Sequence, residues 1–197
     1  MLSIVVPVYN EKENVEVLIL RIERTLSPYF EFEIIFVDDK SDDGTFELLS
    51  DLSQNHPIRV FRKIGKRGKS YSLVQGLREA QFDTLAIIDA DLQYPPEAIL
   101  EMVKKLNEFD VVVANRKTDR NTFLRKALSG TFRLINKSIF NLNFDVQSGL
   151  KVFRREVWES SAYKINSPWT FDLEFLRRSR DLGFKIGSVD IEFSKRN

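Results

Sequence analysis

The chain has 197 residues, of which 43% are hydrophobic and 30% are charged, and its formal net charge is only +1. This composition is typical of one soluble globular domain, and it excludes a disordered chain and a strong overall attraction to nucleic acid. The chain contains no cysteine, which excludes disulfides, thiolate zinc sites and cysteine nucleophiles.

Strand-like and helix-like patterns alternate along the chain. In chain order we expect a strand at 3–8, a helix at 14–26, a strand at 33–38, a helix after 43–45, a strand at 58–61, a helix at 70–80, a strand at 84–89, a helix at 96–107 and a strand at 110–114. This alternation predicts parallel strands joined by crossover helices, that is, an α/β sheet with helices on both faces.

Polar loops follow three of these strands, at 9–11, at 38–44 and at Asp89 and Asp91. Ligands of such sheets bind beyond the carboxyl ends of the strands, so we expect the three loops to open onto one rim. Alternate residues of an extended segment project the same way, which would let Asp89 and Asp91 converge on one hard cation, with Gln93 next in line. A few oxygen ligands suit Mg²⁺ or Mn²⁺ bound together with substrate phosphates, although Asp-x-Asp also occurs in ordinary solvated turns.

Two other rim segments suggest nucleotide and phosphate contacts. Asp39 is assigned the recognition of a base or ribose, with Asp38 in a supporting role, because two consecutive residues of a strand cannot face the same way. The basic, glycine-containing loop 62–69 precedes a helix and suits phosphate binding, or it is a solvated run of charges. Its basic residues are not interleaved with stacking aromatics, so no nucleic acid partner is expected.

The segment from Arg116 onward is basic and amphipathic. Seven basic residues and one acid lie between Arg116 and Lys137, together with regularly spaced apolar residues. Such a segment is typical of a membrane-surface element or of a face for an anionic ligand, and equally of a core-packed helix with a basic edge.

These motifs together resemble family 2 glycosyltransferases with the GT-A fold, in the branch of dolichol-phosphate mannose synthases and polyprenyl-phosphate glycosyltransferases. The matching segments cover nearly the whole chain in order: Val5-Val-Pro-Val-Tyr-Asn-Glu11, Val37-Asp-Asp-Lys-Ser-Asp-Asp-Gly-Thr45, 68–77, Asp89-Ala-Asp-Leu-Gln-Tyr-Pro-Pro-Glu97 and Asp145-Val-Gln-Ser-Gly149 with Arg154. The string from Asp89 to Glu97 is far more specific than Asp-x-Asp alone.

The resemblance implies an inverting, metal-dependent hexose transfer from a nucleotide sugar, such as GDP-mannose or UDP-glucose, to a polyprenyl or dolichyl phosphate. Residues implied to bind the nucleotide sugar are Pro7, Tyr9, Glu11, Asp38, Asp39, Lys69, Asp89, Ala90 and Asp91. Residues implied to hold Mg²⁺ or Mn²⁺ are Asp89, Asp91 and Gln93. Residues implied to bind the acceptor phosphate are Arg116, Arg133, Asn136, Lys137 and Ser148, and the catalytic set is Asp91, Arg116 and Arg133.

A single GT-A catalytic domain is expected over 1–197, with a nucleotide-sugar and metal half at 1–115 and an acceptor half at 116–197. The chain begins directly with strand residues and has no apolar run of about 20 residues, so we expect no signal peptide and a cytoplasmic protein, peripheral at the cytosolic membrane face. Many relatives continue with a membrane region after the point equivalent to Asn197. The chain is therefore interpreted as a minimal enzyme, a truncated one, or a subunit whose partner supplies the anchor.

The chain departs from the family pattern at two places. Residues 62–64 read Arg-Lys-Ile where family members usually have an Asn, and 118–121 lacks the usual glycine. Asp172 and Glu174 lie where other GT-A enzymes place acids on the acceptor side, or they form the acidic edge of a core helix. Two alternatives therefore stay open. One is a family 2 transferase that acts on a soluble sugar or glycan, and the other is a non-catalytic subunit that binds a nucleotide sugar or docks to membranes.

Overall fold

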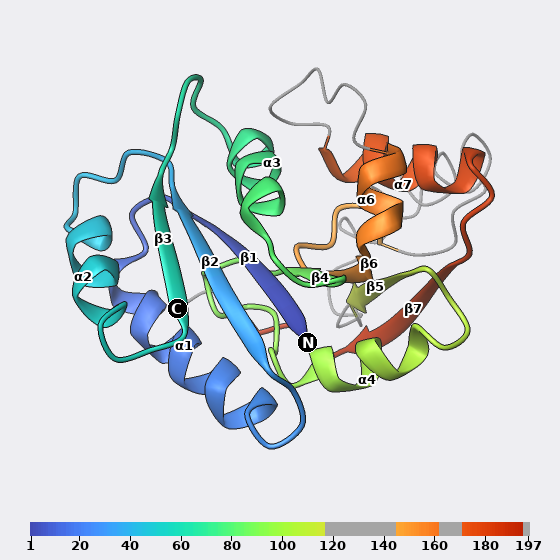
Figure 1. The fold of residues 1–197 in the computed structure, drawn as a ribbon, viewed down its shortest axis with the longest axis horizontal. Helices are drawn as coiled ribbons and strands as arrows, with labels where there is room; N and C mark the ends of the chain where they lie inside the picture. The colour runs from blue at the N-terminus through green and yellow to red at the C-terminus, as the bar shows by residue number, and fades with distance from the viewer. Residues whose placement is uncertain (117–144, 162–170, 195–197) are drawn as a thin grey trace, which may run out of the picture.

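The computed structural model describes residues 1–116, 145–161 and 171–194 (Figure 1). The strands are β1 (Leu2–Val8), β2 (Phe32–Asp38), β3 (Ile58–Arg62), β4 (Thr84–Ile87), β5 (Val111–Arg116), β6 (Lys151–Arg154) and β7 (Ile186–Ile191). The helices are α1 (Lys12–Leu26), α2 (Thr45–Leu52), α3 (Lys69–Glu79), α4 (Ala98–Lys105), α6 (Arg155–Ser161) and α7 (Phe171–Asp181).

The strands form one seven-stranded sheet in the order β3-β2-β1-β4-β6-β5-β7. The pairs β1–β2, β1–β4, β2–β3 and β5–β7 are parallel, whereas β6 runs antiparallel to both of its neighbours. The expected mostly parallel α/β sheet is therefore confirmed. Its carboxyl-terminal edge, where β1, β2, β4 and β5 end, is the edge at which ligands of such sheets bind.

Helices cover both faces of the sheet, as the alternation predicted. One apolar core joins α1, α2 and α4 to the sheet, and the other joins α3, α6 and α7 to its opposite face. Neighbouring strand residues alternate between the two cores: Ile34 and Phe36 belong to the first, Ile35 and Val37 to the second. Burial on both faces explains why these strands read as continuous apolar runs.

The structure differs from the sequence prediction around Asp89. The predicted strand 84–89 ends at Ile87, so Asp89 and Asp91 lie in a turn beyond the strand and not on its extended end. The backbone N–H of Ile88 still donates to Val5, but Leu92 has a positive φ of 61°. The turn, and not strand alternation, therefore orients the two carboxylates.

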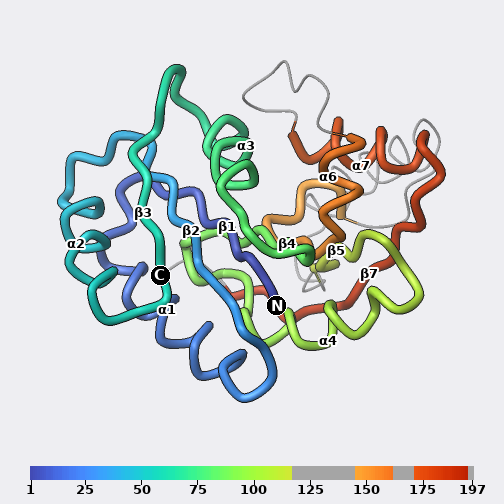
Figure 2. Tube along the Cα trace, in the orientation of Figure 1, coloured from blue at the N-terminus to red at the C-terminus, as the bar shows by residue number. Residues whose placement is uncertain are grey.

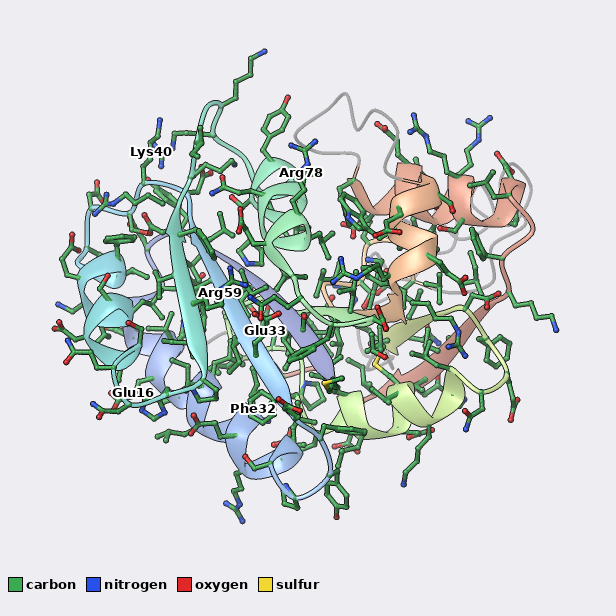
Figure 3. All side chains as sticks on the ribbon, viewed as in Figure 1. Glu16, Phe32, Glu33, Lys40, Arg59 and Arg78 are labelled. Carbon is green, nitrogen blue, oxygen red and sulfur yellow. The ribbon has the colours of Figure 1, made fainter. Side chains whose placement is uncertain are left out.

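The amino-terminal edge of the sheet holds a buried polar cluster centred on Glu33 (Figure 3). The Glu33 carboxylate accepts hydrogen bonds from the Ser3 hydroxyl at 2.7 Å, the Gln81 N–H at 2.7 Å and the Arg59 guanidinium at 3.0 Å. Arg59 also donates to the carbonyl of Glu79 at 2.7 Å. These bonds tie β1, β2 and β3 to the segment between α3 and β4.

Candidate active site

A pocket of about 210 Å³ opens at the carboxyl-terminal edge of the sheet, where the loops after β1, β2 and β4 meet. Its lining residues are Pro7, Val8, Tyr9, Glu11, Asp39, Lys69, Ser72, Asp89, Ala90 and Asp91. Eight of the nine residues that the sequence assigned to the nucleotide sugar therefore meet in one place, and only Asp38 is absent from the lining.

The loops after β1 and β2 are fastened to each other by side-chain hydrogen bonds. The Asn10 amide donates to the Asp42 carboxylate at 2.8 Å and accepts from the Asp42 N–H at 3.1 Å. The Asn10 N–H donates to the Ser41 hydroxyl at 2.9 Å. Asn10 and Lys40 both have positive φ angles, 55° and 65°. Non-glycine residues seldom adopt this conformation, which is held here by the surrounding hydrogen bonds.

The Asp38 and Asp39 carboxylates have different surroundings. The buried Asp38 carboxylate accepts from the N–H groups of Lys40 and Ser41, so it stabilises the turn after β2. Asp39 lines the pocket, and its Oδ2 accepts from the Gly68 N–H at 2.7 Å. Asp39 Oδ1 is buried and accepts no hydrogen bond from the described residues. Because a buried acceptor without a donor is unfavourable, this oxygen is suited to receive an N–H or O–H group from a ligand.

Lys63 belongs to the basic loop 62–69, which the sequence assigned to phosphate binding or to a solvated run of charges, but its side chain is turned inward and buried. Its side chain is only 1% exposed, and its ammonium donates to the Gly68 carbonyl at 3.0 Å and to the Ser72 hydroxyl at 3.1 Å. It lies 3.6 Å from Asp39 Oδ1. Burial lowers the pKa of Lys63, and the charge of Asp39 partly opposes this shift. The one sequence signal was the departure from the usual Asn in 62–64.

Asp89 is packed tightly between a lysine and a glycine. The Lys69 ammonium lies 2.6 Å from Asp89 Oδ1. A Cβ atom on Gly149 would lie 2.1 Å from Asp89 Oδ2, so only glycine fits without displacing the carboxylate. Burial raises the pKa of Asp89, the nearby Lys69 opposes that shift, and the charges of Asp91 and Asp172 add to it. For Lys69, burial lowers the pKa, but the charges of Asp89 and Asp172 outweigh it and the net shift is upward.

The turn after Asp89 directs Asp91 and Gln93 differently. Asp91 lines the pocket, and its carboxylate accepts from the Gln93 N–H at 3.2 Å. The Gln93 side-chain amide donates instead to the Ser194 carbonyl at 3.2 Å. Gln93 does not line the pocket that holds Asp89 and Asp91. The structure therefore brings together two of the three predicted metal ligands.

The chemistry of this pair fits a divalent cation. Asp89 Oδ1 already binds a positive charge, that of Lys69, and Asp91 lines the same pocket. In the described parts of the chain, no group of three or more His, Asp or Glu side chains is placed to hold a metal ion. Mg²⁺ shared with substrate phosphates uses one or two protein carboxylates, which is the set that Asp89 and Asp91 offer.

Arg116 is the last residue of β5 and lies beside the pocket. Its Nε donates to the Asp145 carboxylate, and its guanidinium carbon lies 5.1 Å from the centre of the Phe193 ring. The Tyr94 ring packs edge-on against Phe193 at 5.0 Å. Burial raises the pKa of Tyr94, and a hydrogen bond from the Gly149 backbone opposes this shift. Burial lowers the pKa of Arg116, but the hydrogen bond to Asp145 raises it and the net shift is upward.

A buried lysine on β6 holds the acid from α7. The Lys151 ammonium is bound to the Asp172 carboxylate at 2.6 Å and to the Ser148 carbonyl, and its side chain is fully buried. The Ser148 hydroxyl donates to the Leu150 carbonyl at 3.1 Å. The hydroxyl and the carbonyl of Ser148 are therefore both bonded within the protein. The sequence gave no signal for Lys151, because a lysine that opens a strand is ordinarily a surface residue.

Three predicted acceptor residues, Arg133, Asn136 and Lys137, lie outside the described residues, as does most of the basic amphipathic segment. Of the predicted acceptor set, the structure thus places Arg116 and Ser148. Arg116 is partly exposed at the end of β5, and Ser148 is fully buried.

The chain belongs to glycosyl transferase family 2. The model of that family matches residues 3–161. Two curated relatives are dolichol-phosphate mannosyltransferases. The Pyrococcus furiosus protein is 34% identical over 80% of this chain and 47% of its own length, and the Saccharomyces cerevisiae protein is 30% identical over 98% of this chain and 78% of its own length. The chain thus spans about half the length of the archaeal relative.

Solved structures confirm the predicted GT-A fold. Glucosyl-3-phosphoglycerate synthase from Mycobacterium tuberculosis, in complex with Mn²⁺, UDP and glucosyl-3-phosphoglycerate, superposes with a TM-score of 0.73 at 21% identity, over 100% of this chain and 72% of that one. Mannosyl-3-phosphoglycerate synthase from Rubrobacter xylanophilus superposes with a TM-score of 0.75 at 20% identity, over 100% of this chain and 68% of that one.

Proposed function

We propose that the protein transfers a hexose, with inversion, from a nucleotide sugar of the GDP-mannose or UDP-glucose type to a polyprenyl or dolichyl phosphate. The observation that carries the proposal is the pocket that combines Asp39, whose Oδ1 accepts no hydrogen bond from the described residues, and the Asp89 and Asp91 carboxylates. The similarity to dolichol-phosphate mannosyltransferases over nearly the whole chain supports a lipid-linked phosphate as acceptor.

On the donor side, Asp39 Oδ1 would accept a hydrogen bond from the base or ribose, and Tyr9 would line the nucleotide. Asp89 and Asp91 would hold Mg²⁺ or Mn²⁺ against the diphosphate. When bound, the metal neutralises the charge that develops on the nucleoside-diphosphate leaving group. Lys69, which pairs with Asp89 and lines the same pocket, would supply a positive charge next to the diphosphate.

On the acceptor side, a phosphate oxygen attacks the anomeric carbon of the sugar and forms the new bond. The bond from that carbon to the diphosphate oxygen breaks, and the nucleoside diphosphate leaves with the electron pair. A phosphate monoester has a second pKa near ~6, so it is already a nucleophile at neutral pH and needs no general base. Arg116 and Arg133 would orient it by charge-assisted hydrogen bonds.

The contact between Asp172 and Lys151 supports a phosphate acceptor over a sugar hydroxyl. A sugar hydroxyl needs a base to remove its proton, and Asp172 is the acid expected on the acceptor side. Its carboxylate already accepts a hydrogen bond at 2.6 Å from a fully buried ammonium group, so Oδ1 is occupied by a protein donor and is not open to a sugar hydroxyl. A transferase acting on a soluble glycan therefore remains the second candidate.

Among the described helices, none combines the length and the apolar character needed to cross a membrane. We propose that the protein acts peripherally at the cytosolic membrane face, where it meets the lipid phosphate. A partner subunit that anchors it to the membrane is part of this proposal.

The proposal is tested with GDP-mannose and UDP-glucose, Mg²⁺ or Mn²⁺, and a short-chain polyprenyl phosphate, with glycolipid formation as the readout. We expect transfer that chelation of the metal abolishes. Folded protein that forms no glycolipid across a panel of donors would overturn the proposal. Transfer to free sugars or glycans would favour the second candidate.

The Arg133→Ala variant tests the acceptor side. We expect a large loss of turnover with the lipid phosphate and little change in the dissociation constant of the donor. Lys104→Ala, on α4, which leads to the opposite edge of the sheet, is the matched loss of one basic residue and should leave turnover unchanged. Unchanged turnover of Arg133→Ala would exclude its role in binding the phosphate.

A further inference from the structure

The loop between β3 and α3 projects beyond the two elements that it joins, at the upper edge of the molecule in the ribbon and in the trace (Figures 1 and 2). Ile64 lies on this loop with 83% of its surface exposed, more than any other large hydrophobic residue in the described parts of the chain. An isolated exposed apolar residue is common, so Ile64 gains meaning only from the residues around it.

The residues around Ile64 are basic. We call the exposed group Lys40, Ile64 and Lys66 the basic tip. The neighbouring Arg62 is paired with Glu47 at 2.9 Å, and the guanidinium carbon of Arg67 lies 4.5 Å from the centre of the Tyr9 ring. No acidic residue occurs between 62 and 69. Lys40 reaches the tip from the loop after β2, where Figure 3 shows it, and its ammonium lies 3.4 Å from the Gly65 carbonyl.

The basic tip has a firm base. The buried Lys63 binds the Gly68 carbonyl and the Ser72 hydroxyl. The Gln75 side chain accepts from the Ile64 N–H at 3.0 Å and donates to the Arg62 carbonyl at 3.1 Å. The tip is therefore held in place, and little conformational entropy remains to be lost when it binds.

We propose that the basic tip docks on an anionic lipid bilayer, with Ile64 entering the boundary between headgroups and acyl chains and the cations contacting lipid phosphates. A projecting tip with one exposed apolar side chain close to two exposed lysines suits an anionic bilayer, whereas peptide recognition uses a groove or a sheet edge. The tip rises from the same edge of the sheet as the pocket, because Gly68 at its base is bonded to Asp39. Docking would thus turn the pocket toward the membrane. This inference rests on the proposed function in one respect, namely that the proposed acceptor is a lipid-linked phosphate in a membrane.

The inference is tested by co-sedimentation with vesicles of phosphatidylcholine alone and of phosphatidylcholine mixed with phosphatidylglycerol. We expect tighter binding to the anionic vesicles, weakened by salt. Ile64→Ser should weaken binding about ten-fold, and Lys66→Ala about five-fold. Two control variants change exposed residues of the same kinds at the opposite edge of the sheet. Leu182→Ser is the control for Ile64→Ser, and Lys104→Ala is the control for Lys66→Ala. Both controls should bind vesicles as the wild-type protein does.

Three outcomes would overturn the inference: no binding to either vesicle, equal binding by Ile64→Ser and the unchanged protein, or an Ile64→Ser variant that loses donor affinity while it keeps vesicle binding. The last outcome would assign the loop to the nucleotide sugar. Failure of the proposed function is separable, because vesicle binding that depends on the tip needs no transfer activity. If both hold, Ile64→Ser should lose activity on vesicle-borne acceptor and keep it on a water-soluble short-chain prenyl phosphate.

Discussion

The two edges of the sheet both hold buried acids, but their surroundings differ. At the amino-terminal edge, Glu33 is satisfied by three protein donors, namely Ser3, Gln81 and Arg59. At the carboxyl-terminal edge, Asp39 keeps one oxygen without a hydrogen bond, and Asp89 is paired with Lys69, whose side chain is 43% exposed and can move away. An acid saturated by protein donors stabilises the fold, whereas an acid that keeps an oxygen without a hydrogen bond, or that pairs with a displaceable cation, is available to a ligand.

The largest expected effect is at Asp89. Asp89→Asn should lower transfer by about a thousand-fold, roughly 4 kcal/mol, because an amide holds a divalent cation against a diphosphate far less well than a carboxylate. Metal-dependent donor binding, measured by calorimetry, should be lost together with transfer. Normal transfer by Asp89→Asn would show that Asp89 is not needed to bind the donor, and that the acids of the two edges do not differ in this way. Asp83→Asn, a change in a fully exposed acid before β4, is the matched control.

At the opposite edge, Glu33→Ala should lower the free energy of unfolding by about 3 kcal/mol, because it leaves buried donors without an acceptor. Urea denaturation measures this change. Donor affinity of the folded variant should be unchanged. Glu79→Ala removes a more exposed acid that also pairs with Arg59, at 3.5 Å, and should change stability by less than about 1 kcal/mol. A loss of donor binding in Glu33→Ala would show that the two edges are coupled.

Lys63 lies at the carboxyl-terminal edge, but like Glu33 its polar group is bonded to protein partners, the Gly68 carbonyl and the Ser72 hydroxyl. Lys63→Met should lower the free energy of unfolding by about 2 kcal/mol through its lost hydrogen bonds, and it should weaken donor binding by leaving Asp39 without its neighbour. Urea denaturation and donor calorimetry measure the two effects. A variant with unchanged stability and donor affinity would show that Lys63 does not organise this edge.

The difference in stability between the wild-type protein and Lys63→Met should depend on pH. Burial lowers the pKa of Lys63 below its ordinary value of 10.5, so the unfolded chain binds the proton more tightly than the folded protein. The stability of the unchanged protein relative to Lys63→Met should therefore increase as the pH rises from the lowered pKa toward 10.5. Urea denaturation of both proteins across this range measures it, and a difference that shrinks with rising pH would contradict the prediction.

The smallest effect concerns the strained turn at Lys40, whose φ is 65°. Lys40→Gly should stabilise the protein by up to about 1 kcal/mol relative to Lys40→Ala, because only glycine adopts this conformation without strain. Comparing two substitutions that both remove the charge isolates the backbone contribution. Equal melting temperatures of the two variants would show that the turn is not strained.

Apolar and polar patterning along the chain was enough to predict the alternation of strands and helices, the mostly parallel sheet and the polar loops that gather at its rim. Apolar periodicity follows burial directly, and parallel crossover connections place the loops after β1, β2 and β4 at one edge. Sequence order alone therefore predicts that Tyr9, Asp39 and Asp91 lie at one rim, and the structure shows that all three line one pocket.

Which polar groups are saturated and which remain open depends on packing between segments that are distant in the chain. The antiparallel insertion of β6, the contact of Gly149 with Asp89 and the Lys151–Asp172 pair join segments far apart in the chain, and no local pattern encodes them. The turn at Leu92 separated Gln93 from Asp89 and Asp91 for the same reason, because its conformation depends on long-range contacts. A sequence fixes which groups can form hydrogen bonds, whereas packing decides which of them find a partner.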